Sequence, residues 1–118
     1  MKLISFSSFV NPYQYKIIEP GKKDIVFEFK IPRDYVAFIE QVANSWFPNT
    51  YYIFMVDWEE VVIEREIAPI NLPKVFNPPI LAKRIIRWIA YNKDTEPHCF
   101  EVLCDGYLLN IEEITRIF

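Results

Sequence analysis

The chain has 118 residues, 52% hydrophobic and 25% charged, which is enough for one domain with a core and too apolar for a disordered segment. Its net charge of −3 disfavours nucleic acid as a partner, because nucleic-acid-binding domains usually carry a basic excess. No apolar run approaches the roughly 20 residues of a membrane-spanning helix. We therefore expect one globular domain that binds neither nucleic acid nor a membrane.

Residue counts also exclude several kinds of cofactor site. Glycine occurs only at Gly21 and Gly106, which rules out the glycine-rich loops that bind phosphates. One histidine and two cysteines are too few for a multi-residue zinc site within the chain. Ten Phe, seven Tyr and three Trp beside nine prolines are typical of an aromatic-rich β domain, for which we expect no cofactor.

The first ten residues alternate serine with large apolar residues, which predicts a strand or an extended N-terminal arm. Asn11 and Pro12 end this segment. We therefore divide the chain into an N-terminal arm, 1–10, and a single β domain, 11–118. The arm shows no small-residue cleavage site of a signal peptide, so we expect the protein to stay in the cytoplasm or to be assembled there.

Three elements are predicted in the first half of the domain. Residues 13–19 and 24–31 read as strands, the second with a clear alternation of apolar and polar side chains. Residues 33–47 fit two structures: their periodicity favours an amphipathic helix, whereas the β-like context favours a strand over 34–43. We favour the strand.

The middle of the chain predicts a hairpin followed by a crossover. Residues 51–56 and 61–67 form the predicted strands, and 57–60 the turn. Residues 68–79 hold four prolines, which excludes a helix or a central strand and predicts an extended connection between two sheets.

The last third predicts a long strand over 80–91 and a second hairpin. The hairpin strands are 98–104 and 107–111, and the Asp-Gly pair between them is a strong hairpin-turn signal. Seven or eight short strands with two hairpins predict an all-β fold, an antiparallel β-sandwich, with the jelly roll among its candidate topologies.

The chain contains residue types that can carry out catalysis, but their spacing matches no known catalytic motif. His98 is followed by Cys99, and two neighbours on one strand point to opposite faces. The same alternation separates Cys99 from Cys104 and excludes a disulfide between them. Glu64 and Glu66 would lie about 7 Å apart on one strand face, a spacing that suits acid–base chemistry and is also common on solvated strands. We expect no enzyme and no catalytic residue.

Apolar residues at predicted loops and in the arm are the candidate functional residues. An aromatic side chain at a turn either packs locally or binds a partner, and an apolar arm can add a strand to a partner or fill a groove. The candidate partner-binding residues are Ile4, Phe6, Phe9, Trp58 and Phe76.

Charge is segregated along the chain. Residues 57–66 hold five acidic side chains and one arginine, 67–93 hold five basic side chains and no acidic one, and 94–118 hold six acidic side chains and one arginine. One interpretation is solvated strands whose charges pair within the domain. The other is a set of complementary patches that dock neighbouring copies.

The second half of the chain resembles small virion proteins of tailed bacteriophages. The resemblance rests on the connector APINLPKVFNPPI (68–80), the strand and loop WIAYNKDTEPH (88–98) and the segment FEVLCDGYLL (100–109). It is a resemblance of pattern over about residues 24–110 and identifies no functional residue. It implies a β-sandwich or jelly-roll protein that decorates or joins parts of a capsid.

These observations lead to two hypotheses on function. We expect a non-enzymatic structural protein of a phage virion, a capsid decoration, head or connector protein. It would bind copies of itself or other virion proteins, as a homo-oligomer or on a shell. The alternative is a carbohydrate-binding module, because sandwich folds host such modules and Trp46, Tyr51 and Trp58 could stack on sugars.

Overall fold

The computed structural model of the chain describes residues 2–61 and 73–112. None of the helices within this described part is long and apolar enough to span a bilayer. In chain order the elements are β1 (Ile4–Ser5), η1 (Phe6–Ser8), β2 (Tyr13–Ile18), β3 (Lys23–Lys30), β4 (Tyr35–Asn44), β5 (Thr50–Val56), β6 (Glu59–Glu60), β7 (Lys74–Ala82), β8 (Ile85–Asn92) and β9 (His98–Asn110).

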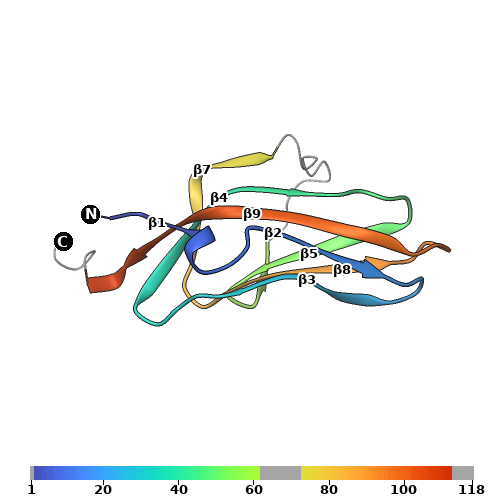
Figure 1. The fold of residues 1–118 in the computed structure, drawn as a ribbon, viewed down its shortest axis with the longest axis horizontal. Coiled ribbons are helices and arrows are strands. Elements are labelled where there is room, and N and C mark those ends of the chain that lie inside the picture. Colours follow the sequence, from blue (N-terminus) through green and yellow to red (C-terminus); the bar gives the residue numbers. More distant parts are fainter. Residues whose placement is uncertain (1, 62–72, 113–118) are drawn as a thin grey trace.

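The strands form two antiparallel sheets that pack face to face as a sandwich (Figure 1). Sheet A has the order β1-β9-β4-β7, with β2 lying along β9 on the same side as β1. Sheet B has the order β3-β8-β5-β6. The predicted all-β sandwich is confirmed.

The strand pairing is that of a jelly roll. Four antiparallel pairs are nested along the chain, from β2 with β9 on the outside, through β3 with β8 and β4 with β7, to β5 with β6 at the centre. Rolling this long hairpin brings β4 against β9 and β5 against β8, which completes the two sheets.

The strand predicted within residues 33–47 is confirmed as β4. A β-bulge in this strand explains why the spacing of its apolar residues resembles that of a helix. In β4 the side chains of Ala37, Ile39 and Val42 are fully buried, so the inward spacing is two and then three residues. The register against β9 shifts between Ile39 and Gln41, which leaves Glu40 as the extra residue. That extra residue imitates the three-residue spacing of an amphipathic helix.

The predicted turn at Asp105 and Gly106 is wrong, because both residues lie inside the 13-residue strand β9. Gly106 faces the bulge of β4, where the chains approach so closely that a Cβ atom would collide with the carbonyl oxygen of Phe38. Here glycine therefore permits a close approach of two strands rather than a turn.

The predicted strand over 80–91 is also divided. β7 ends at Ala82 in sheet A and β8 begins at Ile85 in sheet B, so the chain crosses between the sheets in a two-residue turn. The proline-rich segment is a strand from Lys74 onward, at the edge of sheet A, where a missing backbone N–H is tolerated. Its first residues, 68–72, lie outside the described residues.

The turn of the first hairpin is shorter than predicted, because Glu59 and Glu60 lie in the strand β6. β5 and β6 are joined by Asp57 and Trp58 alone, both with positive φ (52° and 70°), as in a type I′ turn. Of the predicted second strand, 61–67, the structure describes only Val61, which follows β6; Glu64 and Glu66 lie outside the described residues.

The N-terminal residues are built into the sandwich instead of extending from it. Ile4 pairs with Leu108 of β9, and Phe6 is fully buried with its ring edge-on to Phe29, the centroids 5.2 Å apart. The expectation that Phe6 contacts a partner is therefore wrong: its side chain lies in the core.

The core lies between the two sheets and is dominated by aromatic rings. Trp88 of β8 is fully buried and stacks on Phe54, with centroids 4.4 Å apart. Asn92 is the largest fully buried polar side chain, and its Nδ2 donates to the carbonyl oxygens of Ile18 and Glu96, each at 2.9 Å. The rigid sandwich fixes what each sheet presents on its outer face.

Candidate interaction surfaces

The outer face of sheet B carries three rows of side chains, which we call the sheet B grid. The register of β3, β8 and β5 places one residue of each strand in every row, and a bulge of β3 at Val26 lies between the second row and the third. The first row is Lys23, Tyr91 and Tyr51, the second is Ile25, Ile89 and Ile53, and the third is Glu28, Arg87 and Met55.

The middle row is apolar although it faces outward. In β8 the side chains of Ile86, Trp88 and Ala90 are fully buried between the sheets, so Ile89 points to the opposite side, where it is half-buried. The solvated face of an antiparallel sheet is normally polar. Three isoleucines in line on adjacent strands, here half-buried, are typical of a surface that another molecule covers.

The first row is aromatic and basic. The rings of Tyr51 and Tyr91 stack with centroids 5.3 Å apart and an interplanar angle of 16°. The ammonium group of Lys93 lies over both rings, 5.4 Å and 5.2 Å from their centroids. With Lys23 on the neighbouring strand, this end of the grid carries positive charge over an aromatic surface.

The third row is built around one arginine. Arg87 forms an ion pair with Glu28 at 3.2 Å, and its guanidinium lies over the ring of Trp58, 4.8 Å from the centroid. Trp58 keeps 54% of its surface exposed, so it packs locally and still extends the face at this end. Trp58 therefore packs locally, which was one of the two interpretations, and it also remains exposed.

The position of Trp58 depends on the residue before it. The carboxylate of Asp57 accepts hydrogen bonds from the backbone N–H groups of Lys83, Arg84 and Ile85, at 2.9, 2.6 and 3.1 Å. This ties the β5–β6 turn to the β7–β8 turn and holds two residues with positive φ in place.

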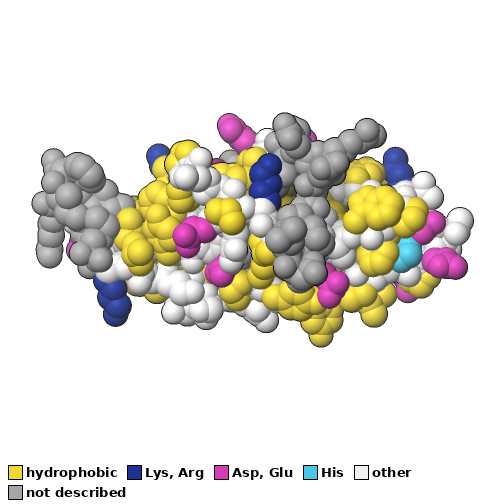
Figure 2. Space-filling model, turned by 90° about the horizontal axis from the view of Figure 1, so that it is seen from above, with side chains coloured by type: hydrophobic (Ala, Val, Ile, Leu, Met, Phe, Trp, Pro, Cys, Tyr) yellow, Lys and Arg dark blue, Asp and Glu magenta, His cyan; other side chains and the backbone are white. Residues whose placement is uncertain are grey.

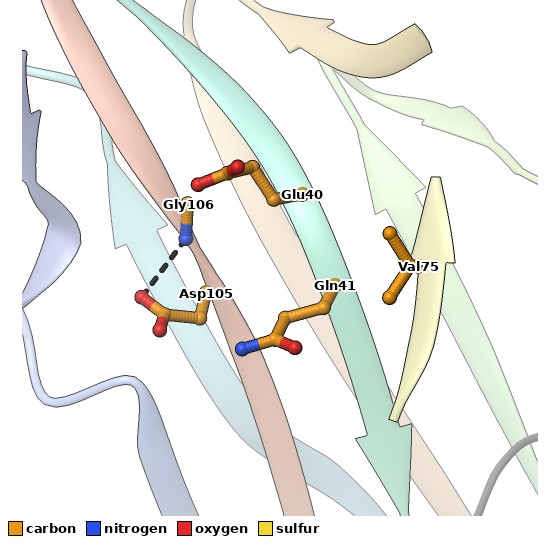
Figure 3. Close-up of a pocket in the computed structure, with 5 residues that line it drawn as sticks. All are labelled: Glu40, Gln41, Val75, Asp105 and Gly106. Carbon is orange, nitrogen blue, oxygen red and sulfur yellow. Dashed lines mark hydrogen bonds between the residues drawn. The ribbon is translucent and has the colours of Figure 1, made fainter. Parts of the chain in front are cut away.

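The outer face of sheet A has a mostly polar hollow at its centre, where the outer face of sheet B has an apolar row. A shallow hollow of about 180 Å³ lies at the bulge of β4, lined by Glu40, Gln41, Val75, Asp105 and Gly106 (Figure 3). The Asp105 carboxylate accepts the Gly106 N–H at 2.9 Å. Figure 2, which looks onto this side, shows hydrophobic side chains in several groups along the molecule, with charged ones between them and at both ends. Within the described residues, no three His, Cys, Asp or Glu side chains lie close enough to hold a metal ion.

The edge of sheet A along β2 exposes further apolar side chains. Tyr15 and Ile17 are each 65% exposed on the outer side of this strand. Beside them Tyr13 donates a short hydrogen bond from its hydroxyl to the Glu101 carboxylate, and this bond raises the pKa of Tyr13 to about 12. The β2 edge is therefore partly apolar and lies beside the acidic side chain of Glu101.

The predicted partner-binding residues do not form one surface. Ile4 and Phe9 lie at the β1 edge of sheet A, where Phe9 is 43% exposed beside Tyr35. Phe76 is half-buried in β7 at the opposite edge of the same sheet. Trp58 stands at the turn of sheet B. Of the set, only Trp58 borders the sheet B grid.

The single histidine is held by its surroundings. Its ring stacks on Phe47 with centroids 4.2 Å apart, and Nε2 of His98 lies 2.7 Å from Oδ2 of Asp94. This hydrogen bond holds the pKa of Asp94 below its usual value. As predicted, the cysteines face opposite sides of β9: Cys99 is exposed, whereas Cys104 is buried, and burial raises its pKa.

The aromatic residues proposed for sugar stacking are spread over the sandwich. Tyr51 lies near the start of β5 and Trp58 follows its end, about 20 Å away at the rise of a strand. Trp46, 74% exposed, precedes β5 in the connection from β4. Tyr51 and Trp58 do not form one stacking platform, so this arrangement does not favour the carbohydrate hypothesis.

The grid was missed because one strand does not show which residues of its neighbours lie beside it. A signal existed in residues 85–91, where one alternating face is wholly apolar and the other is apolar except for Arg87, as expected of a strand that is covered on both sides. The chain matches no protein-family model, no curated protein and no solved structure.

Proposed function

We propose that the chain is a non-enzymatic structural protein of a tailed-bacteriophage virion that works through protein–protein contacts. It would act as a capsid decoration, head or connector protein, assembled in the host cytoplasm. The observation that carries this proposal is the middle row of the sheet B grid, Ile25, Ile89 and Ile53, which is apolar on an outward face.

The composition of the grid supports a protein partner in particular. Protein interfaces combine an apolar centre with a polar rim and are enriched in Tyr, Met and Arg. The grid has its isoleucines at the centre, and the rows on either side contain Tyr91, Arg87 and Met55. The jelly roll is an architecture of viral capsid domains, which supports the virion as the place of assembly by analogy of fold.

The proposal is tested on virus particles. Particles produced from the genome that encodes the chain are purified on a density gradient, and their proteins are identified by mass spectrometry. We expect the chain in the particle fraction at a fixed copy number relative to the main shell protein. A chain that remains with soluble host proteins while particles are complete contradicts the proposed function.

A further inference from the structure

We propose that the sheet B grid is a self-complementary interface, through which two copies of this chain pack face to face around a two-fold axis. The axis runs along the middle row, across the strands and parallel to the plane of the sheet. This inference rests on the proposed function, in that the chain works through protein contacts, and names the partner as a second copy.

The axis follows from the symmetry of the three rows. A two-fold axis along the row of Ile25, Ile89 and Ile53 lays each strand antiparallel over its own copy and exchanges the first and third rows. The isoleucines then meet isoleucines, and packed sheets about 10 Å apart let such side chains interlock. The most apolar part of the face is buried at the centre of the interface.

Each exchanged position brings together groups that attract. Lys23 lies over the partner's Glu28, which gives an ion pair on β3. Tyr91 lies over the partner's Arg87, which places a guanidinium near an aromatic ring on β8. Tyr51 lies over the partner's Met55, a contact between an aromatic ring and a thioether on β5.

The rim of the grid fits the same symmetry. Glu60 of β6 pairs with Met55 and extends the third row, and it is exposed. Lys93 sits over the tyrosines of the first row and is also exposed. Exchange of the rows brings Lys93 toward the partner's Glu60, so opposite charges meet at the rim as well.

Two other arrangements of copies are unfavourable. A two-fold axis along β8 would set Arg87 on the partner's Arg87 and leave Glu28 facing the partner's Met55, which opposes like charges and leaves a carboxylate unpaired. Pairing through the outer face of sheet A would bring the acidic side chains around Glu40 and Asp105 against each other. Only the axis along the isoleucine row pairs every charged group of the grid with an opposite charge or an aromatic ring.

The interface is tested by the solution mass of the full chain, measured by light scattering over a range of concentrations. We expect a dimer of about 28 kDa, twice the 14.1 kDa of one chain. Ile89→Asp places a charge at the centre of the grid and should raise the dimer Kd about 100-fold. Ile17→Asp is the matched control, because Ile17 is an exposed isoleucine on the outer face of sheet A and should leave the Kd unchanged.

A charge reversal and its relief test the register without removing an apolar side chain. Lys23→Glu should raise the dimer Kd about 10-fold, because it opposes the partner's Glu28. Adding Glu28→Gln to this variant removes that repulsion, while the amide oxygen still accepts a hydrogen bond from Arg87, and should bring the Kd back toward that of the wild type. A further loss in the double variant overturns the proposed axis, and circular dichroism checks that each variant is folded.

The outcomes separate this inference from the proposed function. A monomeric wild type, or a dimer that Ile17→Asp breaks and Ile89→Asp does not, overturns the interface. If the chain is then still found in purified particles, the proposed function stands without the dimer. A dimer with the expected variant pattern supports the interface even when the chain is absent from particles, and in that case the proposed function fails alone.

Discussion

Both sheets contain a β-bulge, and their outer faces differ because the bulges lie in different strands. In sheet B the bulge is in the edge strand β3, where the register against β8 shifts between Ile25 and Phe27. The extra residue, Val26, is buried, so the rows across β8 and β5 are kept. In sheet B, β5 and β8 pair residue for residue from Thr50 with Asn92 to Val56 with Ile86. Side chains of one kind therefore line up across strands, and the isoleucine row results. In sheet A the bulge at Glu40 shifts the register of β4 against both β7 and β9. The rows are broken there, and a polar hollow takes their place.

This difference shows how one fold can divide its tasks between two surfaces. Strands that keep register present a face on which side chains repeat in rows, and such a face suits contact with another sheet. A bulge in an interior strand, as in β4, interrupts these rows, and bulges are typical of places where a side chain must be aimed differently. The comparison predicts that perturbing sheet A costs stability of the domain, whereas perturbing the outer face of sheet B costs association.

The largest effect on stability is expected from Phe6→Ala. Phe6 is fully buried and joins the N-terminal turn of sheet A to Phe29 of sheet B. Removing such a ring leaves a cavity and should cost about 3–5 kcal/mol, measured by urea unfolding. Phe9→Ala is the control, because Phe9 is 43% exposed and should cost far less.

An equal loss in the two variants would contradict the placement of Phe6 in the core. It would restore the hypothesis of an extended arm over residues 1–10. The same reasoning predicts that deleting this segment unfolds the domain instead of only weakening assembly.

A smaller loss is expected from Gly106→Ala, which tests the bulge in β4, an interior strand of sheet A. The new Cβ would collide with the backbone oxygen of Phe38, so β4 and β9 would have to separate. We expect a loss of about 3 kcal/mol in the free energy of unfolding, because backbone resists displacement more than a side chain does.

The other glycine is the control for this variant. At Gly21 a Cβ would meet open space, and only the positive φ of 78° opposes it, so Gly21→Ala should cost about 1 kcal/mol. A loss in Gly106→Ala no larger than the loss in Gly21→Ala would contradict the close approach of β4 and β9 in sheet A.

Asp57→Ala should have the next effect and tests how sheet B is tied to the β7–β8 turn. The variant removes the acceptor of three backbone N–H groups, those of Lys83, Arg84 and Ile85. Because the turn stays partly accessible to water, we expect a loss of about 1–3 kcal/mol in urea unfolding. Asp57→Asn retains one acceptor oxygen and should lose less than half as much, and equal losses would show that the hydrogen bonds do not stabilise the turn.

The sequence predicted the class of fold because strand periodicity and turn residues are local signals. The alternation in residues 24–31 led directly to β3. The predictions that were wrong concern features that depend on contacts between residues distant in the sequence. Asp105 and Gly106 have the composition of a turn, yet glycine is needed there because β4 closely approaches β9. A β-bulge, not a helix, produced the spacing of residues 33–47.

The candidate site was harder to predict than the fold. Ile25, Ile53 and Ile89 lie on three strands, and only the register puts them in one row. Phe6 was judged from its place in an apolar N-terminal segment, and its burial follows from the pairing of Ile4 with Leu108. Register is set by packing between elements, so no window of the sequence contains it.

The smallest effect concerns the loop between β8 and β9 and appears only in the pH dependence of stability. The hydrogen bond from His98 keeps the pKa of Asp94 in the folded protein below the ordinary value of 3.8. The ionised carboxylate therefore stabilises the folded state fully above that value, and the contribution is lost as the pH falls through the lowered pKa. Asp94→Asn removes the titrating group, so its melting temperature should lie below that of the wild type at pH 6, and the difference should narrow as the pH falls below 3.8. A difference that stays constant across this range would mean that the loop is stabilised by hydrogen-bond geometry alone, because an asparagine oxygen accepts a hydrogen bond without carrying charge.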